Sequence, residues 1–378
     1  MITPGPGGVP STSATAVSSQ LVSKPRIRIQ IAYNFFLSSH ATGHTRKTNL
    51  AACHGWRLGC AHVRNRFCQI LRVFMPNSKL RIGTRGSKLA LAQAHDVRRK
   101  LCQAHGWDED DVAIKVFTTT GDAVQDRPLM EIGGKGLFTK ELEEALYRHD
   151  VDIAVHSMKD VATTLPPNLA ILCVLEREDP HDVLVGSFSS INELPFGAIF
   201  GTSSIRRAAQ LRHLRPDINV VEFRGNVQTR LQKLNDGVAQ ATFLARAGLN
   251  RLDLNIGHNV PMAEMLPALA QGAVGIEAHE DDEGVRDLLA PLNHEASHGE
   301  ILCERAFLRV LDGSCRTPVA GIAKIQDGKV HLRAEVLRPD GSERLGINGV
   351  ADVSDAEALG KRLGQQVLDR IGPEFMIG

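Results

Sequence analysis

Short apolar segments alternate with helix-like segments from Leu80 onward, and this alternation restricts the fold more than any other feature of the chain. Residues 153–155 have the length of a buried strand, and the chain turns polar directly after them, at Ser157, Lys159 and Asp160. Ligands of α/β proteins bind at the carboxyl ends of the strands, so Lys159 and Asp160 are candidates for a polar site. For this strand alone, a solvated ion pair in a surface loop is the simpler explanation.

Arginine follows three successive predicted strands in the middle of the chain, at residues 198–200, 218–223 and 241–244. Because the carboxyl ends of parallel strands meet at one edge of a sheet, these arginines should lie close together. The fork of an arginine pairs with two oxygens of a carboxylate or phosphate, so the cluster favours a ligand with several anionic groups over surface salt bridges. The polar residues that follow these strands are Ser204, Arg206, Arg207, Arg224, Arg230 and Arg251.

Two further anion contacts are predicted nearer the start of this pattern. Arg85 and Ser87 follow a strand predicted at residues 79–84, and Ser87 is the expected N-cap of a helix whose first N–H groups could meet an anion. Lys135 lies in a glycine-rich segment, residues 133–136, that does not match the P-loop pattern. For Lys135, an exposed lysine without a ligand is the simpler alternative.

Cys315 stands in a tight polar turn after a helix predicted over residues 300–311. Most isolated cysteines are small buried hydrophobic residues, but this turn and the neighbouring Arg316 favour the thiolate form of Cys315. Three strands and a helix follow, which predicts a small α+β domain. These elements are expected at residues 319–325, 330–336, 345–350 and 355–371.

The composition excludes several classes of protein. The seven cysteines form no C-x-x-C pair, which argues against a disulfide framework and a thiolate zinc site and favours a reducing compartment. No apolar run reaches the roughly 18 residues of a membrane span. Aromatic residues make up only 4%, and acidic residues outnumber basic ones after residue 74, so nucleic acid is not an expected partner. No metal site is predicted.

Residues 1–74 contain Lys and Arg but no Asp or Glu, and they are rich in Ser, Thr, Gly and Pro without sustained periodicity. This leader has the composition of an organellar transit segment. Alternatively, it is translated upstream sequence that does not belong to the natural protein, with Met75 as the true start. We favour the second interpretation.

Six motifs, taken together, resemble the hydroxymethylbilane synthase family, also called porphobilinogen deaminase. The resemblance runs from about Leu80 to the C-terminus. Its densest parts are Arg-Ile-Gly-Thr-Arg-Gly-Ser (81–87), Gly-Gly-Lys-Gly-Leu-Phe-Thr-Lys-Glu-Leu (133–142), Asp-Ile-Ala-Val-His-Ser-Met-Lys-Asp (152–160), Gly-Thr-Ser-Ser-Ile-Arg-Arg (201–207), Arg-Gly-Asn-Val-Gln-Thr-Arg (224–230) and Gly-Ser-Cys (313–315).

The resemblance implies an enzyme, a transferase of tetrapyrrole (haem) biosynthesis. It joins four porphobilinogen units head to tail into a linear tetrapyrrole, hydroxymethylbilane, with release of ammonia. It further implies a covalent dipyrromethane cofactor, bound through a thioether to Cys315, that primes the chain. Asp160 would be catalytic, because a carboxylate stabilises the cationic azafulvene that is left when ammonia departs. The remaining roles are cofactor binding by Lys159, Ser204, Arg206, Arg207, Arg224 and Arg230, and substrate binding by Arg85, Ser87, Lys135 and Arg251.

The implied fold class is two periplasmic-binding-protein-like α/β domains plus a small α+β C-terminal domain. We expect domain 1 at 75–175 with a return segment at 273–292, domain 2 at 176–272, and the cofactor-bearing domain at 295–378. A cytoplasmic monomer with a small-molecule substrate is expected, or an organellar protein if the leader is genuine. The chain departs from the family at Glu131, where some members have lysine, and at Ser314, where many have glycine.

A rival interpretation is a non-catalytic binding module whose paired α/β units clamp a polyanionic small molecule. The arginine cluster fits both interpretations equally well. Asp160 and Cys315 favour the enzyme, because an anion receptor gains nothing from a carboxylate in its site or from a tethered thiol.

Overall fold

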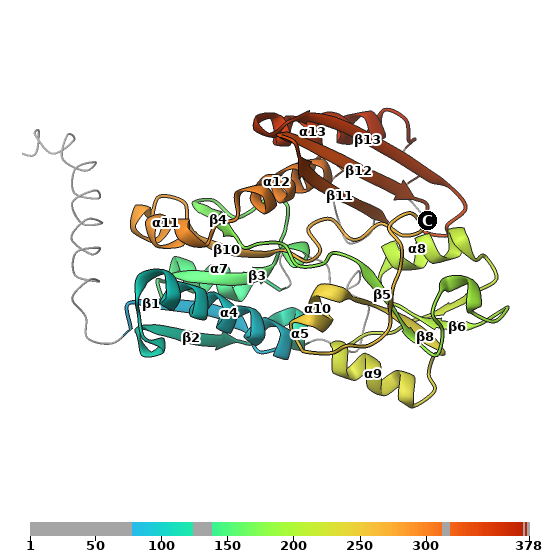
Figure 1. The fold of residues 1–378 in the computed structure, drawn as a ribbon, viewed down its shortest axis with the longest axis horizontal. Coiled ribbons are helices and arrows are strands. Elements are labelled where there is room, and N and C mark those ends of the chain that lie inside the picture. The colour runs from blue at the N-terminus through green and yellow to red at the C-terminus, as the bar shows by residue number, and fades with distance from the viewer. Residues whose placement is uncertain (1–77, 124–137, 312–317, 373–374, 376–378) are drawn as a thin grey trace, which may run out of the picture. The chain divides into compact units, whose positions relative to one another are not determined.

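The structure, a computed structural model, describes residues 78–123, 138–311, 318–372 and 375. Its fold is drawn in Figure 1. The predictions for the leader 1–74 and for Glu131, Lys135, Ser314 and Cys315 lie outside the described residues.

The first sheet has five strands in the order β2-β1-β3-β10-β4. β1 pairs in parallel with β2 and β3, whereas β10 is antiparallel to both β3 and β4. The chain therefore returns to this sheet through β10 after it has built a second sheet. The bounds are β1 Leu80–Arg85, β2 Val112–Phe117, β3 Ile153–Ser157, β4 Leu169–Val174 and β10 Val274–His279.

Helices cover both faces of the first sheet. Successive residues of a strand point to opposite faces, so Ile153 and Val155 pack in one apolar cluster with α4 while Ala154 packs in another with α7. α4 begins after the N-cap Ser87 and ends at Gly106, which adopts the left-handed conformation that glycine tolerates. The helices and turns of this part are α4 Lys88–His105, η1 Glu109–Asp111, α5 Thr120–Ala123, α7 Lys140–Tyr147, η2 Met158–Asp160, α11 Glu283–Leu289 and η4 Ala290–Leu292.

The second sheet has the order β7-β6-β8-β5-β9. β6 is parallel to β7 and β8, and β5 is antiparallel to β8 and β9. Phe200 and Phe243 form the centre of its core, with ring centroids 4.5 Å apart. The bounds are β5 Asp182–Gly186, η3 Ile191–Glu193, β6 Ile199–Gly201, α8 Ile205–Leu214, β7 Asn219–Val221, α9 Val227–Asn235, β8 Ala241–Ala245, α10 Arg246–Asn250 and β9 His258–Asn259.

The two sheets share one topology, in which three parallel strands are extended by an antiparallel strand and a further edge strand. The three arginine-bearing strands of the second sheet are parallel, as the sequence predicted, so their carboxyl ends lie at one edge. The sheet is mixed rather than wholly parallel, because β5 runs antiparallel to β8. Strand β5 was not predicted at all.

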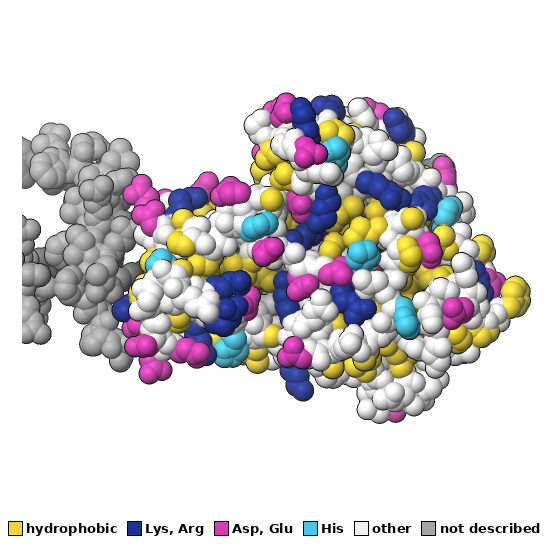
Figure 2. Space-filling view, viewed as in Figure 1, with side chains coloured by type: hydrophobic (Ala, Val, Ile, Leu, Met, Phe, Trp, Pro, Cys, Tyr) yellow, Lys and Arg dark blue, Asp and Glu magenta, His cyan; other side chains and the backbone are white. Residues whose placement is uncertain are grey.

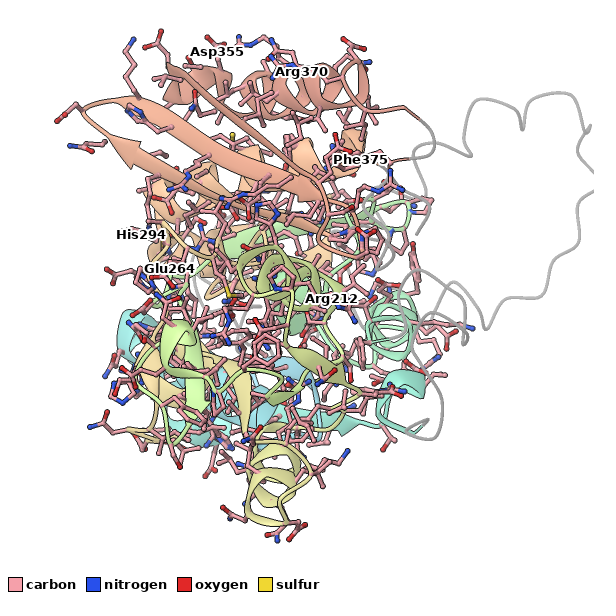
Figure 3. All side chains as sticks on the ribbon, turned by 90° about the vertical axis from the view of Figure 1, so that its right-hand side faces the viewer. Arg212, Glu264, His294, Asp355, Arg370 and Phe375 are labelled. Carbon is pink, nitrogen blue, oxygen red and sulfur yellow. The ribbon has the colours of Figure 1, made fainter. Side chains whose placement is uncertain are left out.

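The C-terminal part is a three-stranded antiparallel sheet, β11-β12-β13, packed against two helices. Its elements are α12 Glu295–Val310, β11 Val319–Gln326, β12 Lys329–Leu337, β13 Arg344–Asp352, η5 Val353–Asp355 and α13 Ala356–Leu368. Figure 3 shows α13 next to this sheet, with Asp355 and Arg370 near the two ends of the helix. The predicted class, two α/β domains followed by a small α+β domain, is confirmed.

The described helices include none that is both long enough and apolar enough to cross a membrane.

Candidate functional site

Lys159 and Asp160 lie on a single turn, η2, that directly follows the buried strand β3. Met158 anchors this turn, because its side chain is buried and its N–H donates to Ala273 O at 3.0 Å. The Met158 sulfur packs over Gly275 of β10, where a Cβ atom would overlap it. One buried residue thus fixes the turn, and its two charged neighbours remain exposed.

The other end of the turn is held by α12. Arg305 Nη1 donates to Val161 O at 3.1 Å, and Arg305 Nη2 donates to Ala162 O at 2.6 Å. Arg309 Nε donates to Thr163 O at 3.2 Å. α12 ends at Val310. The helix that holds the Asp160 turn is therefore also the one that leads in sequence to Cys315, which lies outside the described residues.

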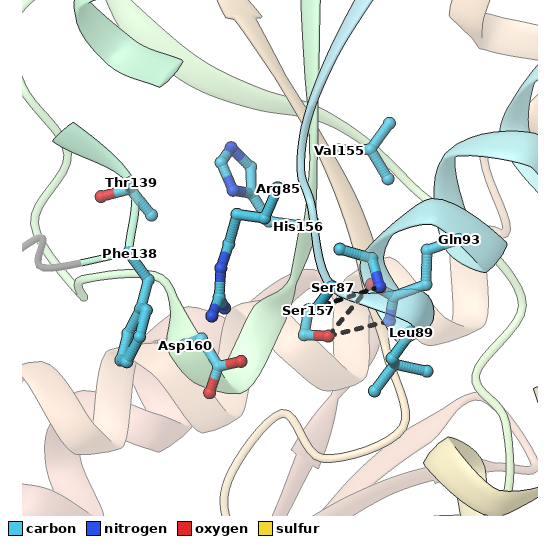
Figure 4. Close-up of a pocket in the computed structure, with 11 residues that line it drawn as sticks. Arg85, Ser87, Leu89, Gln93, Phe138, Thr139, Val155, His156, Ser157 and Asp160 are labelled. Carbon is cyan, nitrogen blue, oxygen red and sulfur yellow. Dashed lines mark hydrogen bonds between the residues drawn. The ribbon is translucent and has the colours of Figure 1, made fainter. Parts of the chain in front are cut away.

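A small pocket of about 50 Å³ adjoins Asp160. Figure 4 shows Arg85 between Phe138 and Asp160, with its guanidinium directed toward the carboxylate. The Arg85 guanidinium carbon lies 4.3 Å from the centre of the Phe138 ring, a cation–π distance. The pocket is lined by Arg85, Ser87, Leu89, Ala90, Gln93, Phe138, Thr139, Val155, His156, Ser157 and Asp160.

Polar side chains on the floor of this pocket are paired. Gln93, which is buried on α4, donates to Ser157 Oγ at 2.8 Å. Ser87 accepts from Ala90 N at 3.2 Å, so its hydroxyl caps α4 as predicted. His156, which also lines the pocket, has its Nε2 3.0 Å from Glu277 Oε2, and both side chains are buried.

Arg206 and Arg207 lie in the first turn of α8, which Ser204 caps. Both arginines are buried against Asp182, the first residue of β5. Arg206 Nη1 lies 2.7 Å from Asp182 Oδ2, and Arg207 Nη2 lies 2.7 Å from Asp182 Oδ1. Burial alone would raise the pKa of Asp182, but the two guanidinium groups outweigh it and lower this pKa, so the carboxylate stays ionised.

Arg230, on α9, joins the same cluster. Its Nε donates to Gly225 O at 2.8 Å. Burial lowers the pKa of Arg230 to about 10, and repulsion from Arg207 and Arg224 adds to this effect, whereas Asp160 opposes it. Arg230 therefore interacts electrostatically with charged residues of both α/β domains: Asp160 in the first, and Arg207 and Arg224 in the second.

The charged residues of this cluster also shift the pKa of Lys159. Although the residue keeps an exposed surface, desolvation by the surrounding protein lowers the pKa of its amine to about 8. Asp160 and Asp182 oppose this shift, while Arg207 and Arg206 reinforce it. In Figure 2, Lys and Arg side chains occur beside Asp and Glu side chains in the middle of one face.

The structure thus brings together most of the predicted anion-binding residues. Among the described residues, the group holds five cations and the carboxylates of Asp160 and Asp182, and Glu335 on β12 also attracts Arg206. The cations still outnumber the carboxylates, so the group carries excess positive charge that an anionic ligand would balance. The five cations are Lys159, Arg206, Arg207, Arg224 and Arg230.

Arg251 is placed differently from the other predicted arginines. Its Nη2 donates to Gly272 O at 2.9 Å, in the crossing between the two α/β domains. Burial lowers the pKa of Arg251, and the charges that oppose this are Glu178 and Asp96 rather than Asp160 or Asp182. Two other predicted site residues, Lys135 and Cys315, lie outside the described part of the chain.

Sequence reasoning missed Asp182 and the pocket residues Gln93, Phe138 and Ser157. A signal for Asp182 exists, because a single acidic residue directly precedes the apolar run at 183–185. This signal would place Asp182 beside the arginines only if β5 were known to run antiparallel to β8. Among the described residues, no group of three or more His, Cys, Asp or Glu side chains could hold a metal ion.

Comparisons with known proteins agree on one family. Residues 80–287 match the family model "Porphobilinogen deaminase, dipyromethane cofactor binding domain", and residues 299–369 match "Porphobilinogen deaminase, C-terminal domain". The porphobilinogen deaminase of Paracoccus denitrificans is 54% identical over 303 residues, which cover 79% of this chain and 97% of that protein. The chloroplastic porphobilinogen deaminase of Pisum sativum is 48% identical over 305 residues, covering 78% and 83%.

Two solved structures of binding proteins show a distant resemblance to the chain. A putative methionine-binding lipoprotein of Bacillus subtilis has 11% identity and a TM-score of 0.36, with 57% of this chain and 90% of that chain covered. A putative periplasmic sulfonate-binding protein of Methylobacillus flagellatus has 13% identity and a TM-score of 0.32, with 60% and 66% covered.

Proposed function

Because this chain belongs to the porphobilinogen deaminase family, we propose that it joins four porphobilinogen units head to tail into hydroxymethylbilane. It is a transferase of tetrapyrrole biosynthesis and a member of a family with a dipyrromethane cofactor. In each step the aminomethyl carbon of porphobilinogen loses ammonia and forms a new carbon–carbon bond. The cofactor, when bound, supplies the first pyrrole carbon that acts as nucleophile.

The cationic cluster fits a group of this kind. Pyrroles derived from porphobilinogen carry acetate and propionate arms, and the cluster has more guanidinium and ammonium groups than carboxylates to balance them. Burial is the main cause of the lowered pKa values of Lys159 and Arg230, and repulsion from neighbouring arginines adds to it. We assign cofactor binding to Lys159, Ser204, Arg206, Arg207, Arg224 and Arg230, and the thioether bond to Cys315.

Asp160 is the proposed catalytic residue. When ammonia leaves, the substrate becomes a positively charged azafulvene, and a nearby carboxylate lowers the energy of that charge. The same carboxylate can accept hydrogen bonds from pyrrole N–H groups. The observation that supports this assignment is the position of Asp160, on an exposed turn at the pocket and within the field of the cationic cluster.

The substrate-binding residues are assigned by their position near this pocket. Arg85 and Ser87 line it, so they are proposed to hold the carboxylate arms of the incoming porphobilinogen. Lys135 lies in the family motif 133–142 and Arg251 follows the third arginine-bearing strand, and both are proposed for the same role. A cytoplasmic monomer is also proposed. Because the Pisum sativum relative is named chloroplastic, an organellar form is the alternative if the leader is genuine.

Intact mass and peptide mapping of the purified protein test this function. We expect a covalent adduct on Cys315 equal to two porphobilinogen units less two molecules of ammonia. An unmodified chain that cannot acquire this adduct from porphobilinogen would refute the proposed function. The rival anion receptor would instead bind porphobilinogen reversibly, without a change in mass.

A further inference from the structure

Asp182 is an acidic residue at the edge of the sheet that otherwise presents arginines. It is only 2% exposed and begins β5, directly opposite Ala245 at the end of β8. Since β5 runs antiparallel to β8, the start of β5 and the carboxyl ends of the parallel strands lie at the same edge.

The side chain of Asp182 contacts three residues in two other parts of the chain. Its Oδ1 accepts from Arg207 Nη2 at 2.7 Å and from Arg207 Nε at 3.1 Å. The same oxygen accepts from Gln271 Nε2 at 3.0 Å, and Gln271 lies in the returning crossing between the α/β domains. Its Oδ2 lies 2.7 Å from Arg206 Nη1. One buried carboxylate therefore touches both arginines of α8 and the crossing.

These contacts fix the orientation of both guanidinium groups. All three nitrogens of the Arg207 guanidinium donate hydrogen bonds, because Nε and Nη2 donate to Asp182 and Nη1 donates to Phe243 O at 2.8 Å. Arg206 Nη1 also donates to Leu266 O at 2.7 Å. Within the described part of the chain no hydrogen bond or ion pair is found for its Nε or Nη2, although Glu335 attracts the guanidinium. Arg206 thus keeps its Nε–H and both Nη2–H groups for a ligand, and Arg207 keeps one N–H on each Nη atom.

The placement of the two arginines requires such a partner. Arg206 and Arg207 lie in the first turn of α8, where the helix dipole disfavours cations, and no acidic residue lies in that turn. Buried ion pairs contribute little to stability on balance, because desolvation offsets their attraction. A role in stability alone therefore explains Asp182 poorly, whereas a role in orienting Arg206 and Arg207 for an anion accounts for its contacts with both arginines.

We propose that Asp182 is a positioning residue for cofactor attachment, which holds Arg206 and Arg207 in the orientation that binds the carboxylate arms of the dipyrromethane. The inference rests on the proposed function and extends it to a residue on a strand outside the family motifs quoted above. Asp182 acts through the two arginines and does not itself touch the ligand.

The test compares Asp182→Asn with Asp217→Asn as a matched control. Asp217 pairs with Arg215 at 2.7 Å in the same domain, so its substitution also removes one carboxylate from an arginine. Each chain is made in a host that cannot synthesise porphobilinogen, incubated with porphobilinogen, and followed by intact mass. We expect Asp182→Asn to acquire the adduct at least tenfold more slowly than the unsubstituted chain, and Asp217→Asn to stay within twofold of it.

A double-mutant cycle with Arg207→Gln separates positioning from loss of stability. If Asp182 acts through Arg207, Asp182→Asn slows adduct formation much less when Arg207 is already Gln. All four chains are compared at a temperature where circular dichroism shows them folded. Strictly multiplicative effects, or an Asp182→Asn chain that loads as fast as the unsubstituted one, would overturn the inference and leave the proposed function intact. If the unsubstituted chain acquires no adduct, the proposed function itself fails.

Discussion

Arg305 should position the turn that carries Asp160, the proposed catalytic residue, and its substitution by Met tests this directly. The residue is 8% exposed and donates to two carbonyl groups that follow Asp160, at 3.1 and 2.6 Å, and more weakly to a third, Thr163 O, at 3.4 Å. Among the described residues it forms no ion pair. Burial, followed by repulsion from Arg309, lowers the pKa of Arg305 to about 10. Burial of the Arg305 cation is therefore unfavourable, and its hydrogen bonds to the turn oppose that unfavourable free energy.

The magnitude follows from these opposing effects. Hydrogen bonds from a charged donor contribute roughly 1.5–3 kcal/mol each, and Arg305 makes two short ones. The unfavourable burial of the cation places the sum near its lower end, so we expect Arg305→Met to lower the free energy of unfolding by about 2–3 kcal/mol. A displacement of the Asp160 carboxylate by about 1 Å is enough to reduce kcat by roughly 100-fold. We therefore expect a loss in kcat of between about 10- and 100-fold.

The assay pairs urea unfolding with steady-state turnover of the loaded enzyme. Arg309→Met is the control, because Arg309 lies one helical turn later, is exposed, and donates to Thr163 O at 3.2 Å. It should lose no more than about 1 kcal/mol and retain kcat within about threefold. If Arg305→Met loses stability but keeps the kcat of the unsubstituted enzyme, then the contacts of Met158 alone hold the turn. The reasoning from α12 would then be wrong.

Three further predictions concern the cluster and the leader. Asp160→Asn should abolish turnover while the adduct on Cys315 and the melting temperature are retained, as mass spectrometry and calorimetry would show; substantial activity would mean that another group stabilises the charge. The pKa of Lys159 is about 8, so its charge is present below pH 8 and is lost as the pH rises through 8. The rate at which the chain acquires the adduct from porphobilinogen should therefore fall severalfold between about pH 7 and 9, and intact-mass measurements on Lys159→Gln should show no such step. A chain that begins at Met75 should fold and turn over normally; an insoluble or inactive product would contradict our interpretation of residues 1–74.

Local patterns were sufficient for much of the site. The abrupt change from apolar to polar after residues 153–155 located Asp160, because a buried strand must end where its chain becomes solvated. Ser87 was predicted as an N-cap because a hydroxyl before a helix satisfies free N–H groups, and it caps α4 in the structure. Ser204 caps α8 in the same way, although it was predicted only as an anion contact.

Long-range geometry was beyond the reach of these patterns. Arg251 follows β8 in sequence, as Arg224 follows β7, yet the short helix α10 carries it to the crossing at Gly272. The burial of Arg206 and Arg207 could not be inferred either, because an arginine at a helix start has the same sequence whether its partner is solvent or Asp182. That partner depends on the direction of β5, which the path of the whole chain determines.

The two carboxylates of the cluster differ in ways that decide their roles. Asp182 is buried, accepts hydrogen bonds from Arg207 and Gln271, and lies against Arg206, so its charge is consumed by orienting groups within the protein. Asp160 is exposed on a turn that other residues hold in place, and its charge faces the pocket. A carboxylate can stabilise a developing cation only if no permanent partner neutralises it as tightly as the arginines neutralise Asp182. Both groups are aspartate carboxylates, so their different surroundings, and not their chemical type, account for the different roles that we propose for them.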